Sequence, residues 1–151
     1  MEIEVGGRPF LLEALRSVKG VSDEELKGRA SLDIAGNEIL VPLPHVLLKA
    51  KLSNALELVQ EDRQDVKHVK VLAVVLREYL IDLARAATEE NERESLRIVR
   101  EAVEVAKSAN SKKFEEDHGI RLGEYIPLER LENSTARLAS FARIEYKKRF
   151  E

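Results

Sequence analysis

The strongest pattern in the sequence is a long helical segment, residues 66–87, which is apolar almost all round between Val69 and Leu83. A helix that is apolar on all sides is normally covered on all sides. We therefore expect this segment to be the central and most buried helix. Residues 44–60 precede it and carry one apolar face at helical spacing, with a proline at the start where its missing N–H is not needed.

Two further patterns complete the predicted helical part. Residues 89–109 begin with acidic residues and carry their basic residues later, an order that complements the helix dipole. Residues 133–150 form a last predicted helix, with Leu138 and Phe141 on its inner face. Between them, residues 108–123 are polar and charged, so we expect a loop or a partly helical connector there.

The first 43 residues follow a different pattern, because they hold five of the seven glycines and two of the four prolines. Glycine and proline separate short elements. We expect a strand over residues 1–5, a turn at the two glycines that follow, and a strand or short helix over residues 9–15. Ser22 and Glu25 have the spacing of a capping box, which predicts a helix over residues 23–29.

A β-hairpin is predicted at the end of this first part. Residues 31–34 and 38–41 alternate apolar and polar side chains on either side of Ala35-Gly-Asn37. A Gly-Asn pair between two such runs favours a tight turn between antiparallel strands.

The predicted fold is therefore α+β and mostly α. A small β-containing segment over residues 1–43 precedes a bundle of about four helices over residues 44–151. The length of 151 residues fits one compact domain. The 25 basic and 28 acidic residues give a net charge of −3, so no general attraction to nucleic acid or to an anionic membrane is expected.

Several functional classes are excluded by residues that the sequence lacks. It contains no cysteine, which excludes disulfides, thiolate metal sites and a cysteine nucleophile. The glycine-rich phosphate loops and the motifs of serine hydrolases, zinc proteases and kinases are also absent. Since the sequence shows neither a signal peptide nor an apolar run of ~20 residues, we expect a cytoplasmic protein.

Acidic residues occur in pairs that could in principle hold a metal ion. Glu2 and Glu4 alternate along a predicted strand, and residues 115–118 have the sequence Glu-Glu-Asp-His. Solvated surface carboxylates explain such pairs more simply, and the three histidines are scattered at 45, 68 and 118. No metal site is predicted.

Two lysines on the first long helix carry the most informative polar signal. Lys49 and Lys51 are two residues apart, so they point about 200° apart and one of them approaches the buried side. A lysine there needs a carboxylate or must extend outward. A structural ion pair of Lys51 with Asp65 or Glu13 is the favoured interpretation, and contact with a phosphate is the alternative.

The same stretch resembles a known family. A helix with Lys51 and Asn54 is followed by a polar link with Arg63, Asp65 and Lys67 and then by a buried helix. This order resembles the C-terminal part of nucleotidyltransferase-like proteins of the polymerase-β superfamily. These include the AbiEii type of abortive-infection and toxin–antitoxin systems. The resemblance covers about residues 3–83 and extends through the predicted hairpin.

The preceding segment agrees with this resemblance and also departs from it. Glu13 falls where the family has its third carboxylate, usually an aspartate, but the Gly-Ser turn and the Asp-x-Asp pair that hold the metal ions are missing. Glu2 and Glu4 have the spacing of the Asp-x-Asp pair, but no helix precedes them to bind a phosphate. The resemblance therefore implies a truncated, split or degenerate version that is not active alone, with magnesium and nucleotide bound only if a catalytic segment is supplied.

These observations leave three hypotheses. The first is a noncatalytic or split nucleotidyltransferase-like domain, from a toxin–antitoxin or defence context, with a surface that faces a nucleotide or a partner. The second is a helical module that binds a protein partner or itself and takes no small ligand. The third, least favoured, is nucleic-acid binding through the basic residues 147–149 and Arg143, which dipole compensation already explains. The candidate ligand- or partner-facing residues are Arg8, Glu13, Lys51, Asn54, Arg63, Asp65 and Lys67.

Overall fold

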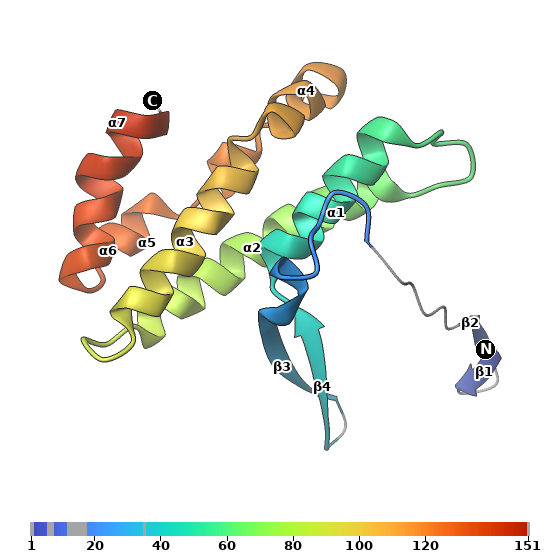
Figure 1. Ribbon diagram of the computed structural model, residues 1–151, viewed down its shortest axis with the longest axis horizontal. Coiled ribbons are helices and arrows are strands. Elements are labelled where there is room, and N and C mark those ends of the chain that lie inside the picture. The colour runs from blue at the N-terminus through green and yellow to red at the C-terminus, as the bar shows by residue number, and fades with distance from the viewer. Residues whose placement is uncertain (1, 6–7, 12–17, 35, 151) are drawn as a thin grey trace.

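The computed structural model describes residues 2–5, 8–11, 18–34 and 36–150, and confirms a mostly α fold with a small β part (Figure 1). The strands are β1 (Glu2–Val5), β2 (Arg8–Leu11), β3 (Arg29–Ile34) and β4 (Asn37–Pro42). The helices are α1 (Pro44–Glu57), α2 (Asp65–Ala86), α3 (Glu92–Ala106), α4 (Ala109–His118), α5 (Leu128–Glu132), α6 (Ala136–Ser140) and α7 (Tyr146–Phe150). Two 3-10 turns, η1 (Glu25–Lys27) and η2 (Leu122–Tyr125), and a π-helical turn, η3 (Phe141–Glu145), complete the elements.

The strands form two separate antiparallel pairs. In the β3–β4 hairpin, Arg29 lies opposite Pro42 and Ile34 opposite Asn37, which confirms the predicted hairpin. Gly36 adopts φ +80°, a conformation that L side chains rarely take, and donates its N–H to Asp33 Oδ1 at 3.0 Å. The hairpin extends away from the helices in Figure 1.

The β1–β2 pair confirms a strand at each predicted place. Glu2 lies opposite Leu11, and Val5 lies opposite Arg8. The predicted turn at residues 6–7 and the end of the second predicted element, residues 12–15, lie outside the described residues.

The capping box is present, but the helix predicted after it is wrong. The Ser22 N–H donates to Glu25 Oε2 at 2.9 Å, and the Glu25 N–H donates to Ser22 Oγ at 3.3 Å. Only the single turn η1 follows, because Gly28 is already extended and Arg29 pairs with Pro42 in the hairpin. The capping signal acts locally, whereas the strand pairing brings together residues that are distant in the sequence.

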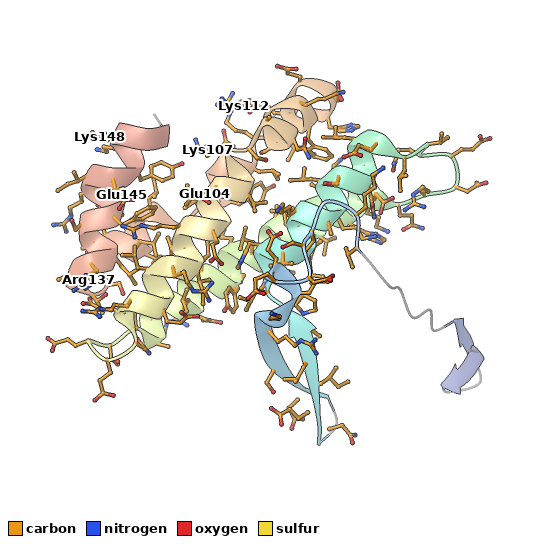
Figure 2. The ribbon with its side chains drawn as sticks, in the orientation of Figure 1. Glu104, Lys107, Lys112, Arg137, Glu145 and Lys148 are labelled. Atoms are coloured by element: carbon orange, nitrogen blue, oxygen red, sulfur yellow. The ribbon has the colours of Figure 1, made fainter. Side chains whose placement is uncertain are left out.

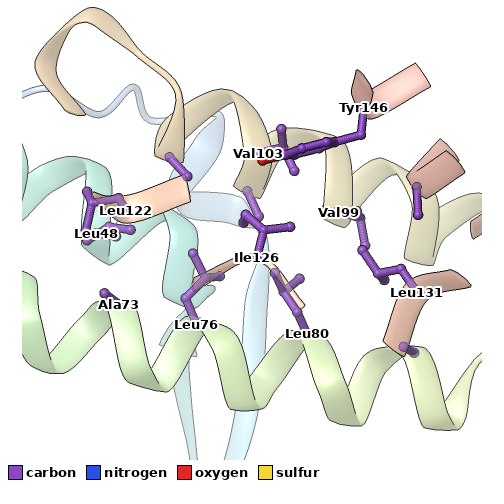
Figure 3. Close-up of a cluster of buried hydrophobic side chains, with 14 of the residues drawn as sticks. Leu48, Ala73, Leu76, Leu80, Val99, Val103, Leu122, Ile126, Leu131 and Tyr146 are labelled. Atoms are coloured by element: carbon purple, nitrogen blue, oxygen red, sulfur yellow. The ribbon is translucent and has the colours of Figure 1, made fainter. Parts of the chain in front are cut away.

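The core lies between α1, α2 and α3 and is closed by the later, shorter elements (Figure 3). α2 contributes a row of buried residues, among them Ala73, Leu76 and Leu80, at the three- and four-residue spacing of one helix face. Val99 of α3 and Leu131 of α5 pack into the same cluster.

The opposite face of α2 is not covered, so the expectation that this helix is buried all round is wrong. Val71, Val74 and Val75 are 53%, 51% and 45% exposed. The elements that contact α2 most, namely α1, α3, α5 and η2, pack against the buried row on its other side. The described part of the chain does not cover the three valines.

The polar connector contains a helix of its own. α4 begins at Ser108, whose side chain accepts a hydrogen bond from the Ser111 N–H, and it ends at Gly119, which has φ +67°. Phe114, on this helix, is fully buried. The presence of α4 agrees with the expectation of a partly helical connector. The short helices α4 and α5 are present in addition to the four predicted helices.

The last predicted helix consists of α6, η3 and α7 in direct succession. Within η3 the backbone shifts to the wider π pattern, and the Tyr146 N–H bonds to the Phe141 carbonyl. Arg100 Nη2 of α3 lies 2.6 Å from Glu145 Oε2, and Nζ of Lys107, the C-cap residue of α3, lies 5.4 Å from the centre of the Tyr146 ring. Figure 2 labels Glu145 on the C-terminal helix and Lys107 at the end of α3. Two consecutive side chains of this helix therefore contact α3 and its cap.

Candidate functional site

Three of the predicted residues meet where α1 passes into α2. Asp65 is the first residue of α2, and its side chain is only 3% exposed. Lys51 Nζ lies 2.9 Å from Asp65 Oδ1, and Arg63 Nε lies 2.6 Å from Asp65 Oδ2. Burial acts to raise the pKa of Asp65, but the hydrogen bonds from Lys51 and Arg63 outweigh it and hold that pKa below its ordinary value.

This cluster joins α1 and α2, which pack against each other. The link between them turns at Asp62, which has φ +60°, and Gln60 Nε2 donates to the carbonyls of Asn54 and Leu58 at 2.9 and 2.8 Å. The Leu58 carbonyl lies just beyond the end of α1, and the Asn54 carbonyl also accepts the Leu58 N–H at 3.1 Å. Asp65 is one of the two partners expected for Lys51, so the favoured interpretation of Lys51 as half of a structural ion pair agrees with the geometry.

Two other predicted residues, Asn54 and Lys67, have described side chains that do not take part in the cluster. Asn54 lies on α1 beside Lys51, and Lys67 is exposed on α2, two residues from Asp65 and therefore on another side of the helix. Arg8 lies on β2, and Glu13 lies outside the described residues. Among the predicted residues whose side chains the structure describes, it unites only Lys51, Arg63 and Asp65.

An apolar groove runs beside this cluster between α1 and α2. Its volume is about 430 Å³. Its lining is mostly aliphatic, with polar side chains toward one end: Val18, Leu47, Ala50, Lys51, Asn54, His68, Val71 and Leu72. Val71 belongs both to this groove and to the exposed valine face of α2, so the two form one continuous apolar surface.

A second hollow, of about 410 Å³, surrounds His45, which the sequence reasoning did not select. His45 is 4% exposed, and its Nε2 lies 3.2 Å from Glu101 Oε2. Burial lowers the pKa of His45, and Glu101 offsets only part of this effect. The buried Nδ1 of this ring has no hydrogen-bond partner among the described residues.

A carboxylate on the wall of this hollow is strongly paired. Glu25 Oε1 lies 2.6 Å from Lys49 Nζ. Burial acts to raise the pKa of Glu25, but the bonds from Lys49 and Ser22 lower it to about 2. No group of three His, Cys, Asp or Glu side chains that could hold a metal ion occurs within the described ranges. The hollow can offer a hydrogen-bond acceptor, but the described residues that line it bring no serine, threonine or cysteine nucleophile to His45.

The basic C-terminal end is partly used within the fold. Arg143 donates to the carbonyl of Glu132, the last residue of α5, at 3.1 Å. Lys147 and Lys148 are exposed. Cationic side chains often donate hydrogen bonds to the last carbonyl groups of a helix.

Comparison with known proteins finds no matching family model, no matching curated protein and no matching solved structure. In the part of the chain that the structure describes, no helix has the length and apolar character needed to cross a membrane.

Proposed function

We propose that this chain is a noncatalytic protein-binding domain whose binding surface is the valine face of α2, namely Val71, Val74 and Val75, together with the adjoining α1–α2 groove. The single observation that carries the proposal is the exposure of these three valines on the helix that forms the centre of the core. This is the partner-facing form of the nucleotidyltransferase-like hypothesis, and it also fits the hypothesis of an interaction module.

Clustering distinguishes this surface from ordinary exposed apolar residues. Among the residues whose exposure the structure describes, seven large hydrophobic residues are markedly exposed, and three of them lie in one five-residue segment of α2, residues 71–75. Contiguous apolar patches of this kind mark interaction sites. A fully buried valine contributes roughly 1.5–3 kcal/mol, so covering the remaining exposed half of three valines would contribute about 2–4 kcal/mol.

The charges nearby favour a protein over a nucleotide. Lys51 is the cation that lines the groove, and both Lys51 and the nearby Arg63 are held on the buried Asp65 carboxylate. A phosphate would have to compete with that carboxylate for them. The groove itself offers mainly aliphatic contacts, which suit apolar side chains of a protein partner.

The proposal can be tested in the cells that make the protein. A photo-crosslinking residue, p-benzoyl-phenylalanine, is placed at position 74, and a matched control is placed at Glu116, which is exposed on α4. Mass spectrometry then identifies the crosslinked protein and the site on it. We expect one defined protein at position 74 and none at position 116. The absence of any adduct at position 74, or the same adducts at both positions, would contradict the proposal.

A further inference from the structure

We infer that the partner on the valine face is a second copy of this chain, held in an antiparallel two-fold contact of α2 with α2 centred between Val74 and Val75. The inference deepens the proposed function and rests on it. It follows from the order of charges along the exposed face of the helix.

The exposed face is a narrow, straight stripe. Because successive residues of an α-helix are rotated by about 100°, Lys67, Val71, Val74, Glu78 and Asp82 all point within about 80° of one another. Each is exposed, and the stripe lies opposite the buried row of α2. One straight helix can therefore meet all five positions at once.

The stripe is basic at one end and acidic at the other. Lys67 and Lys70 precede the valines, whereas Glu78 and Asp82 follow them. Lys67, Lys70 and Glu78 form no ion pair with any residue that the structure describes, and Asp82 pairs only with Arg85, at 2.8 Å with both side chains more than 70% exposed. An exposed pair of this kind is worth little, so Asp82 can also accept a second cation.

A two-fold axis at the middle of the stripe turns its outermost charges, Lys67 and Asp82, into matching pairs, and it places Glu78 level with Val71 of the second copy. It places Lys67 level with Asp82 of the second copy, and Val74 level with Val75. Every contact then occurs twice, as an isologous interface requires. A parallel arrangement would instead place Lys67 against Lys67 and Asp82 against Asp82, so like charges exclude it.

The groove makes the contact larger than one pair of helices. A helix of 22 residues is about 33 Å long, and the apolar lining between α1 and α2 adjoins the stripe at Val71. Specific interfaces bury at least roughly 1,000 Å² in total. The stripe and the adjoining groove together offer the second copy a broad apolar centre with charges at both ends.

The antiparallel geometry makes a prediction that other geometries do not share. Lys67→Glu alone and Asp82→Lys alone each place like charges at both ends of the dimer. Mixing the two variants restores opposite charges in a heterodimer. At one end, the carboxylate introduced at position 67 of the first variant meets the ammonium introduced at position 82 of the second. At the other end, the unchanged Asp82 of the first variant meets the unchanged Lys67 of the second. The double variant Lys67→Glu/Asp82→Lys restores them in a homodimer. Within one chain the two positions are 15 residues apart, about 22 Å along the helix, so they cannot rescue each other internally.

Sedimentation equilibrium of the purified full chain from about 5 to 500 µM measures these states, with circular dichroism to verify that each variant is folded. We expect a dimer for the unchanged protein, at least about tenfold weaker dimerisation for each single variant, and recovery for the mixture and for the double variant. Lys113→Glu and Glu116→Lys on α4 are matched controls of the same charge change, because both positions are exposed, and they should dimerise normally.

A folded protein that stays monomeric throughout this range overturns the inference, and so does a mixture that stays monomeric while the single variants are folded. These failures differ from failure of the proposed function. A monomer whose position 74 still crosslinks to one other protein leaves the proposed function standing and excludes the second copy. A monomer with no crosslink at position 74 contradicts both.

Discussion

Replacing Lys51 with methionine tests whether the Lys51–Arg63–Asp65 cluster holds α1 and α2 together. Methionine keeps the length and the apolar stem of lysine but removes the charge that lies 2.9 Å from Asp65 Oδ1. Asp65 is then left 3% exposed with a single cationic partner, Arg63. We expect the variant to fold and to be measurably less stable.

The magnitude follows from the burial of the two partners. Breaking a fully buried ion pair costs about 3–5 kcal/mol because it leaves an uncompensated charge. Here Lys51 is one-third exposed and Arg63 remains on the carboxylate, so the loss is nearer to that of one charged hydrogen bond, about 1.5–3 kcal/mol. Removing both cations should cost more than the sum of the single changes, because only then is the buried carboxylate without a partner.

Urea unfolding at pH 7, followed by circular dichroism, measures these differences at a fixed protein concentration. Lys113→Met on α4 is the matched control, since Lys113 is exposed, and it should change the free energy of unfolding by less than about 0.5 kcal/mol. A change for Lys51→Met as small as that of the control would refute the structural role of the pair. So would additive effects of Lys51→Met and Arg63→Met.

Three further predictions use other parts of the fold. The folded-state pKa of Glu25 is about 2, against an ordinary 4.5, so its contribution to stability is present above pH 4.5 and is lost as the pH falls toward 2. Glu25→Gln should therefore reduce the loss of unfolding free energy between pH 4.5 and pH 2, measured by unfolding experiments across this range. An unchanged dependence of the unfolding free energy on pH would contradict the pairing with Lys49. Phe114→Ala should lower the free energy of unfolding by about 3–5 kcal/mol, because the ring is fully buried; a loss below about 1 kcal/mol would mean that α4 is not packed as described. Calorimetric titration with ATP and Mg²⁺ should give no binding heat, because Lys51 and Arg63 are engaged by Asp65, and saturable heat that Lys51→Met abolishes would favour the nucleotide-facing hypothesis instead.

The elements that depend on local signals could be predicted from the sequence. The β3–β4 hairpin follows from two alternating runs around Gly36, and α1, α2 and α3 lie within a few residues of their predicted bounds. The helix predicted after Ser22 failed because the pairing of Arg29 with Pro42 involves residues that are far apart in the sequence. A capping signal cannot report such a competition.

Burial was the least predictable property of the candidate surfaces. An apolar pattern shows where a helix can be covered, but not whether the rest of the chain has enough elements to cover it, so the exposure of Val74 could not be inferred. The Lys51–Asp65 pair could be proposed because Lys49 and Lys51 are two residues apart and therefore point about 200° apart on the helix. His45 was missed because its partner, Glu101, is 56 residues away, and nothing local connects the two.

The π-helical turn has a consequence for how the C-terminal helix tolerates length changes. A π turn holds one residue more than the α-helix around it, so the pattern of side chains after η3 is rotated relative to the pattern before it. Shortening the turn by one residue would rotate everything from Tyr146 onward by about 100°. Tyr146 would leave Lys107 and its buried position. A one-residue deletion here should therefore lower the free energy of unfolding more than a substitution at any single exposed position of the same helix. The π turn thus sets which side chains of the C-terminal helix face α3.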